Sequence, residues 1–240
     1  MKKWQKVSLV ASGIVCSIVV ITCVYLWATP YKLIDENSLK SDENVMVKDS
    51  NNWITFFPSE NNDEAGVIFY PGGRVEANAY APIARRVAEQ GVPFIIAKMP
   101  LHLAVLSSNK ADTILEKFDE REWVLAGHSL GGAMAARYVK HNPDRVSGLI
   151  LLAAYPAEGD DLTDFAGEVL TIKGQLDGVI NEERLTESDH LLPSQTSTII
   201  IQGGNHSQFG DYGLQNGDNE AKITKEEQWN RIVEAIVRSF

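Results

Sequence analysis

The stretch VLAGHSLGGAMAARYV, residues 124–139, decides the fold of this chain. Its first residues are apolar without interruption, which predicts a buried strand, and its last residues repeat apolar side chains at the spacing of a helix. Ser129 lies where one pattern changes into the other, with Gly127 and Gly131 two positions away on either side. A sharp turn here needs neighbours without side chains, and it lifts the serine hydroxyl clear of the sheet. The stretch therefore predicts a strand, a tight turn and a helix, with an accessible serine at the turn.

Short apolar runs alternate with helical patterns through the rest of the chain. Strands are expected at residues 45–48, 53–57, 66–70, 92–100, 122–126, 146–156, 167–174 and 197–202, and helices at 76–91, 131–141 and 225–240. Apolar strands that alternate with helices are typical of an α/β protein, in which helices cover both faces of a mostly parallel sheet. Ligands of such sheets bind in the loops that follow the carboxyl ends of the strands.

Three chemically reactive side chains fall in such loops, in the order Ser129, Asp177, His206. A serine hydroxyl is a weak nucleophile unless a base takes its proton. We expect His206 to be that base. We expect Asp177 to hold the imidazole in the right tautomer and to stabilise its cation. The three residues together predict a nucleophilic catalytic triad.

The Gly-x-Ser-x-Gly pattern at residues 127–131, followed in order by Asp177 and His206, resembles the nucleophile elbow and triad of the alpha/beta-hydrolase family. The resemblance extends from Trp53 to the end of the chain. It implies the α/β fold of that family. The resemblance is more specific than the five-residue pattern alone, because the pattern lies between a predicted strand and a predicted helix.

The resemblance also implies where an oxyanion would be bound. The backbone N–H of Leu130 lies at the N-terminus of the helix that follows Ser129, and a helix N-terminus stabilises negative charge. The second donor implied is the backbone N–H of Gly73, just past the strand at 66–70. Arg74 is the alternative donor if that loop is one residue longer.

The activity implied is that of a serine hydrolase, which cleaves the carboxylic ester of a small acyl substrate through an acyl-enzyme and needs no cofactor. Only ten residues, 157–166, separate two successive strands where many relatives carry a cap, so a cap-poor member is expected. Such members resemble dienelactone hydrolases and small carboxylesterases, although the nucleophile of the former is a cysteine. An acyltransferase, thioesterase or peptidase would use the same triad. The alternative to an enzyme is a non-catalytic protein of the same fold that binds a ligand or partner at the cell surface.

Several other residues carry side chains that are capable of related chemistry. His128 adjoins the serine, but the sharp turn directs its side chain away from that of Ser129. An acid can also follow an earlier strand, where Asp160, Asp161 and Asp164 lie. The acidic loop GDYGLQNGDNEAKIT, residues 210–224, lacks the ligand spacing of a calcium loop, so no metal site is expected. Five apolar residues line an acyl pocket or belong to the core: Met99, Leu101, Leu103, Tyr155 and Phe209.

The first residues have a different composition. Residues 7–29 carry no charge over 23 positions, enough for a helix across a bilayer core of ~30 Å, and three lysines precede them. This predicts a cytoplasmic segment 1–6, a transmembrane anchor 7–29, a tether 30–44 and an extracytoplasmic catalytic domain 45–240, held at the cell membrane. The alternative is secretion after signal cleavage. Segments 70–91, 97–106 and 204–213 are similar to those of a group of bacterial membrane-anchored or secreted alpha/beta hydrolases.

The charge of the remainder excludes one class of partner. All 32 acidic residues follow residue 29 together with 19 of the 22 basic ones, which gives a formal net charge of −13. A domain so acidic is repelled by phosphate backbones, so no nucleic acid partner is expected. Both cysteines lie inside the apolar run, which leaves residues 30–240 without a disulfide or a cysteine metal site.

Overall fold

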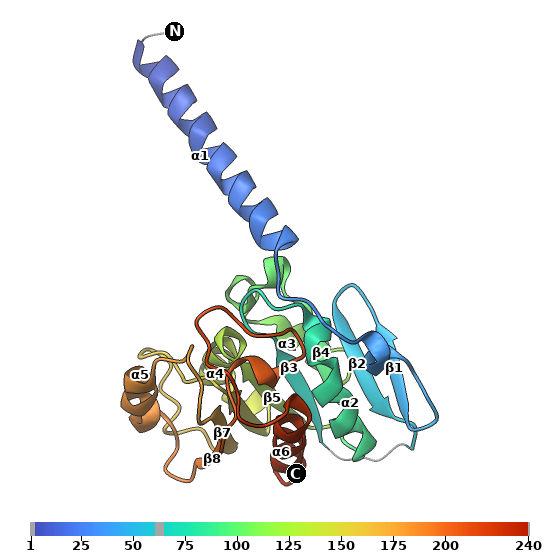
Figure 1. The fold of residues 1–240 in the computed structure, drawn as a ribbon. Coiled ribbons are helices and arrows are strands. Elements are labelled where there is room, and N and C mark those ends of the chain that lie inside the picture. The colour runs from blue at the N-terminus through green and yellow to red at the C-terminus, as the bar shows by residue number, and fades with distance from the viewer. Residues whose placement is uncertain (1–2, 61–64, 240) are drawn as a thin grey trace.

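The computed structural model describes residues 3–60 and 65–239, and an eight-stranded sheet lies at the centre of these ranges (Figure 1). Its spatial order is β1-β2-β4-β3-β5-β6-β7-β8. The six strands β3 to β8 run parallel, whereas β2 is antiparallel to both β1 and β4. The bounds are β1 Val45–Asp49, β2 Trp53–Pro58, β3 Gly66–Tyr70, β4 Phe94–Ala97, β5 Trp123–His128, β6 Gly148–Leu152, β7 Glu168–Gly174 and β8 Ser197–Ile201. The predicted mostly parallel sheet is confirmed.

Helices cover both faces of this sheet because successive side chains of a strand point to opposite sides. On β3, Val67 and Phe69 join the core on the side of α2 (Ala81–Glu89) and α6 (Lys225–Val237), which contact each other. Ile68 and Tyr70 join the opposite core, which contains apolar side chains of the two helices α3 (Lys110–Leu115) and α4 (Leu130–His141). A further short helix, α5 (Glu182–Glu187), follows β7.

The helix α6 begins at a reciprocal cap. The hydroxyl of Thr224 accepts the N–H of Glu227 at 3.1 Å, and the carboxylate of Glu227 accepts the N–H of Thr224 at 2.8 Å. Such a capping box satisfies two backbone donors that a helix start would otherwise leave unpaired. It fixes the position of Gln228 in the first turn, whose fully buried side chain bonds both backbone groups of Asn205.

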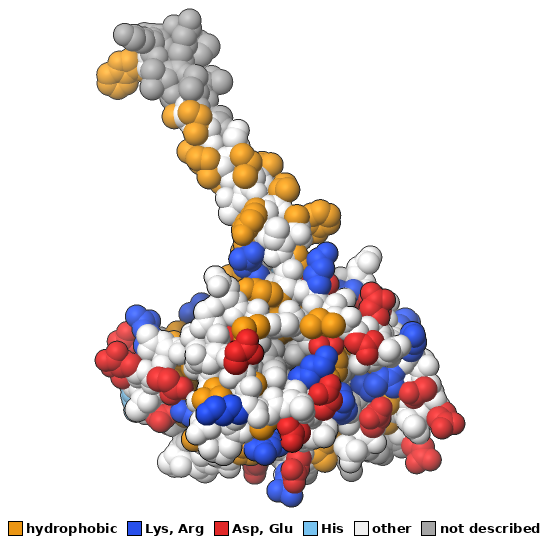
Figure 2. All heavy atoms as spheres, in the orientation of Figure 1, with side chains coloured by type: hydrophobic (Ala, Val, Ile, Leu, Met, Phe, Trp, Pro, Cys, Tyr) orange, Lys and Arg blue, Asp and Glu red, His pale blue; other side chains and the backbone are white. Residues whose placement is uncertain are grey.

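The first helix, α1 (Lys3–Ala28), projects away from the sheet and its helices (Figure 1). Apolar side chains in the middle of α1 and in the half nearer the domain are exposed, among them Ile14, Ile18, Ile21 and Trp27. Figure 2 shows hydrophobic side chains along this part of the helix. In residues 3–60 and 65–239, no helix meets both the length and the apolar character of a bilayer span. The predicted anchor at 7–29 is therefore not confirmed. Residues 1 and 2 of the predicted cytoplasmic segment lie outside the described residues.

The segment 30–44, predicted as a tether, lies against the domain. Tyr31 forms an isolated parallel bridge with Val75, and the N–H of Ile34 donates to the carbonyl of Asp211 at 3.0 Å. Arg85 of α2 donates to the carbonyl of Ser38 at 3.1 Å. The predicted tether is thus a segment that long-range hydrogen bonds hold against the loops after β3 and β8 and against α2.

Candidate active site

Ser129 occupies a strained turn between β5 and α4. Its φ of 52° and ψ of −123° lie outside the regions that non-glycine residues prefer, at a cost on the order of 1–3 kcal/mol. The surroundings hold the turn in place. A Cβ on Gly127 would lie 2.5 Å from the carbonyl carbon of Gly131, and a Cβ on Gly131 would lie 2.1 Å from the carbonyl oxygen of Tyr70. The glycines therefore let α4 start directly against the ends of β3 and β5.

His206 and Asp177 form a buried pair. Nδ1 of His206 lies 2.7 Å from Oδ2 of Asp177, and the two side chains are 1% and 0% exposed. The carboxylate can only accept, so Nδ1 donates the proton and Nε2 of a neutral ring carries the lone pair. The other oxygen of Asp177 accepts the N–H groups of Val179 and Ile180 at 2.9 and 2.8 Å. Nε2 of His206 is buried and has no hydrogen-bond partner in the described residues.

The fold brings this pair to the nucleophile turn. The ring of His128, the residue before Ser129, lies 4.4 Å from the ring of His206, measured between centroids. Because Nε2 of His206 has no partner, it makes no hydrogen bond to the hydroxyl of Ser129 here. Hydrogen bonds of this kind are often long before substrate binds. His206 thus lies beside the turn that carries Ser129, at the carboxyl edge of the sheet, and no hydrogen bond joins the two side chains in the described residues.

The two predicted oxyanion donors are neighbours. Leu130 is the first residue of α4. A Cβ on Gly73 would lie 3.1 Å from Cδ2 of Leu130, so the backbone of Gly73 passes close to that residue. The N–H of Arg74, the alternative donor, already donates to the carbonyl of His102 at 2.8 Å. The geometry therefore favours Gly73 over Arg74.

His128 has a structural partner that the sequence did not indicate. Its Nδ1 lies 2.9 Å from the hydroxyl of Tyr80, which accepts the N–H of Gly72 at 2.9 Å. Burial raises the pKa of Tyr80, so the hydroxyl keeps its proton and can donate it to Nδ1. Burial, reinforced by neighbouring His206, holds the pKa of His128 well below its usual range. A neutral, fully buried His128 supports the turn and the Gly72 loop rather than acting as the base.

Two of the three alternative acids have other partners. Asp160 pairs with Arg137 at 3.2 Å, and Asp161 accepts the N–H of Thr163 at 2.9 Å. Asp164 is exposed. In the described part of the chain, no group of three or more histidine, cysteine, aspartate or glutamate side chains is arranged to hold a metal ion. Asp177 is thus the carboxylate that the structure places on His206.

Known proteins resemble this chain in sequence and in fold. A model of the "Alpha/beta hydrolase family" matches residues 66–230. The chain belongs to the alpha/beta hydrolase family. A protein of Mycobacterium phage D29 named "Putative non-heme haloperoxidase" is 30% identical over 100 residues, which are 38% of this chain and 36% of that protein. The match thus spans little more than a third of that relative's length.

Two solved structures illustrate the likeness of fold. A novel esterase from Mycobacterium tuberculosis has 15% identity and a TM-score of 0.58, and the match covers 83% of this hydrolase and 91% of that chain. A membrane phospholipase A described as a bacterial virulence factor has 12% identity and a TM-score of 0.59, with 99% of both chains covered. At these identities the comparison shows a shared fold.

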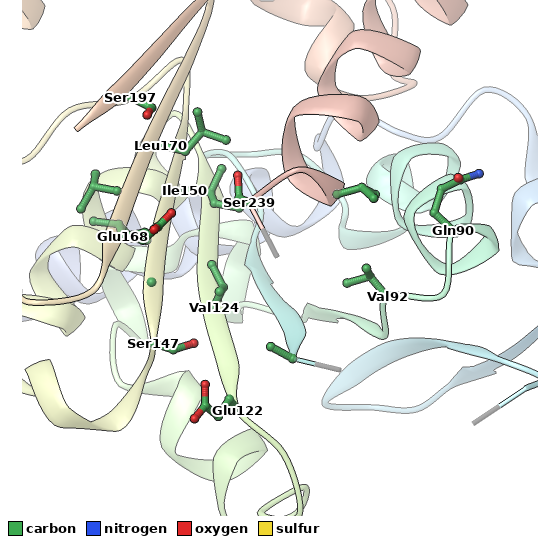
Figure 3. Close-up of a pocket in the computed structure, with 15 residues that line it drawn as sticks. Gln90, Val92, Glu122, Val124, Ser147, Ile150, Glu168, Leu170, Ser197 and Ser239 are labelled. Atoms are coloured by element: carbon green, nitrogen blue, oxygen red, sulfur yellow. The ribbon is translucent and has the colours of Figure 1, made fainter. Parts of the chain in front are cut away.

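Two cavities lie at opposite edges of the hydrolase sheet. One of about 350 Å³ is lined by Pro71, next to the Gly72–Gly73 backbone, and by Met99, Leu101 and Trp27. The other, of about 580 Å³, opens at the amino ends of the strands, away from Ser129, and its lining includes Glu122, Ser147, Glu168 and Ser197 (Figure 3). Of the five predicted pocket residues, Met99 and Leu101 line the first cavity. Phe209 is instead fully buried and stacks on His128 at 5.3 Å.

Proposed function

We propose that this hydrolase cleaves carboxylic esters through an acyl-enzyme formed on Ser129. The observation that carries the proposal is the buried hydrogen bond between His206 and Asp177. Nε2 of His206 has no partner in the described residues, and His206 lies beside the strained turn of Ser129. A base held by a carboxylate beside a serine at a strand-to-helix turn is the arrangement that nucleophilic acyl transfer needs.

The proposed reaction runs in two halves. The hydroxyl oxygen of Ser129 attacks the acyl carbonyl carbon while its proton passes to Nε2 of His206. The negative charge that develops on the carbonyl oxygen is bound by the N–H groups of Leu130 and Gly73. The C–O bond to the alcohol then breaks, and the alcohol leaves with the proton from His206. Water repeats the sequence on the acyl-enzyme, which releases the carboxylic acid and restores the serine.

An ester substrate is supported by chemistry and by likeness. The cavity of about 350 Å³ beside the Gly72–Gly73 loop offers room for a small acyl group, and its lining is mixed, with Met99 and Leu101 beside polar residues such as Glu76. The solved structure from Mycobacterium tuberculosis that shares the fold is named an esterase. Thioesters, peptides and alcohol acceptors would use the same residues, so they belong in the test.

The test compares the native chain with Ser129→Ala on a p-nitrophenyl short-chain ester, the matching thioester and a peptide anilide. We expect the ester to be the best substrate and the variant to fall to the uncatalysed rate while its circular dichroism stays native. A second assay adds a competing alcohol, because an acyltransferase would then release a new ester in place of acid. Equal ester turnover by native chain and variant would contradict the proposal.

We also propose that α1 holds the catalytic domain at the outer face of the cell membrane. The uncharged sequence of residues 7–29, the lysines that precede it and the exposed apolar side chains of α1 support this. The test is fractionation of cells that express the full chain or residues 31–240. Retention of the full chain by membranes after alkaline carbonate, with release of the shorter chain, is expected. If cells that express the full chain instead release a product shortened at its N-terminus into the medium, that result would favour secretion.

A further inference from the structure

The acidic loop after His206, residues 210–224, folds back over the loops that carry the proposed base and acid. We propose that Asp218 in this loop is a positioning residue that holds the loop of Asp177 against the loop of His206. The inference rests on the proposed function, because it assigns a role through those two residues.

The carboxylate of Asp218 joins the two loops directly. Its Oδ1 accepts the N–H of Gly178 at 2.9 Å and the N–H of His206 at 3.4 Å. Its Oδ2 accepts the N–H of Ser207 at 2.7 Å and the hydroxyl of Ser207 at 2.5 Å. From these two loops the side chain therefore receives four donors, one from the residue after Asp177 and three from His206 and its neighbour. A fifth donor, the N–H of Asn219 at 2.9 Å, comes from the loop of Asp218 itself.

Asn219 binds the same two loops at the residues that precede the proposed acid and base. Its Nδ2 donates to the carbonyl of Leu176 at 3.1 Å, and its carbonyl accepts Nδ2 of Asn205 at 2.7 Å. Leu176 precedes the proposed acid and Asn205 precedes the proposed base. With Asp218 on the following residues, each loop is held immediately before and after its catalytic side chain. We call Asp218 and Asn219 the loop clamp.

The clamp approaches the acid loop closely. A Cβ on Gly178 would lie 2.8 Å from Nδ2 of Asn219 and 2.8 Å from the carbonyl oxygen of Gly217. The absence of a side chain at Gly178 lets the two loops approach to hydrogen-bond distance. A shift of either loop would change the separation of His206 from Asp177, which is 2.7 Å here. Misplacing a catalytic group by about 1 Å can lower the rate about 100-fold.

The two aspartates of the acidic loop, Asp211 and Asp218, have partners within the protein and need no bound cation. The oxygens of Asp218 face N–H and O–H donors, which occupy the directions that a calcium ion would require. Asp211, at the start of the loop, pairs with Lys225 of α6 at 2.7 Å and accepts the N–H of Asp35 at 3.2 Å. These carboxylates fasten the loop to the domain.

The test compares Asp218→Ala and Asp218→Asn with the matched control Asp42→Ala. Asp42 also accepts two backbone N–H groups, those of Asn44 and Val45 at 2.9 Å each, but it lies away from the site. Each full-length chain is treated with a fluorophosphonate, and both the rate constant and the final fraction of labelled Ser129 are measured. Hydrogen exchange of the backbone amides in 176–180 and 204–208 is followed in parallel.

For Asp218→Ala we expect a labelling rate constant lower by about 10- to 100-fold, a final labelled fraction equal to the native one, and faster exchange in both segments. The KM for a short ester should stay within about twofold while kcat falls. Asp218→Asn keeps the size of the side chain but turns an amide NH₂ toward two donors, so it should fall between native and Asp218→Ala. Asp42→Ala should label at the native rate.

Three results would overturn the inference. One is native labelling and native exchange in both Asp218 variants. Another is a lower labelled fraction in which the remaining molecules react at the native rate, because that describes partial unfolding alone. If the native chain takes no label, the proposed function fails, and the exchange measurement still decides the clamp. In that case, faster exchange at 176–180 in the Asp218 variants supports the clamp, and unchanged exchange rejects it.

Discussion

Nδ1 of His206 lies 2.7 Å from Oδ2 of Asp177, while the other oxygen of Asp177 is held by two backbone N–H groups. The carboxylate is therefore fixed at both oxygens and cannot rotate freely. It sets the tautomer of His206, which leaves the lone pair on Nε2 to take the proton of Ser129 in the reaction that we propose. The loop after β7 therefore orients the carboxylate of Asp177, and the carboxylate in turn orients His206.

Asp177→Asn tests this relationship with little change of shape. The amide can turn its NH₂ toward His206, which would hold the ring in the wrong tautomer. We expect ester turnover to fall by about 10⁴-fold in kcat with a native melting temperature. A fall of less than tenfold would mean that Asp177 does not orient the base.

Gly131→Ala tests the packing of the turn. The added Cβ would lie 2.1 Å from the carbonyl oxygen of Tyr70, a backbone atom at the end of β3. We expect either no soluble protein or a loss of at least several kcal/mol in the free energy of unfolding, measured with urea. Gly159→Ala is the control, because a Cβ there meets no atom within 4 Å. Equal unfolding midpoints for the two variants would contradict the account.

Tyr80→Phe tests the link between His128 and the loop of the proposed oxyanion donor. The change leaves the buried N–H of Gly72 without its acceptor, at a cost of about 1–3 kcal/mol in the free energy of unfolding. Ester turnover should also fall, since the Gly72–Gly73 backbone loses a fixed point. The control is Tyr31→Phe, whose hydroxyl accepts an exposed N–H from Asn216 at 3.2 Å. Losses of the same size in both variants would argue against a specific role for Tyr80.

The low pKa of His128 predicts a contribution to acid sensitivity. In the unfolded chain this histidine takes a proton near its ordinary pKa of 6.5, whereas in the folded chain it stays neutral to lower pH. Below pH 6.5 the unfolded state thus binds more protons, so stability falls with falling pH by up to about 1.4 kcal/mol per unit from this group. His128→Gln should show a shallower loss between pH 6.5 and 5 in urea titrations. Identical slopes for native chain and variant would contradict the assignment.

The strands and the nucleophile turn were predictable because their signals are local. Buried strands are continuous apolar runs, and the turn at Ser129 needs glycine within two residues on either side. The contacts of Tyr80 and Asp218 join residues far apart in sequence through irregular loops, which have no periodicity to read. Asp218 lies in a loop for which the sequence predicted only that it lacks a metal site. The seating of residues 30–44 on the domain was missed for the same reason, since polar composition does not reveal long-range backbone pairing.

The most direct measurement of the central claim is to label the full-length hydrolase with a fluorophosphonate and map the adduct by mass spectrometry. We predict one adduct, on Ser129, that disappears in Ser129→Ala and in His206→Ala while both variants keep their native circular dichroism. No adduct on the folded native chain, or an adduct on another residue, would contradict an activated serine at this site.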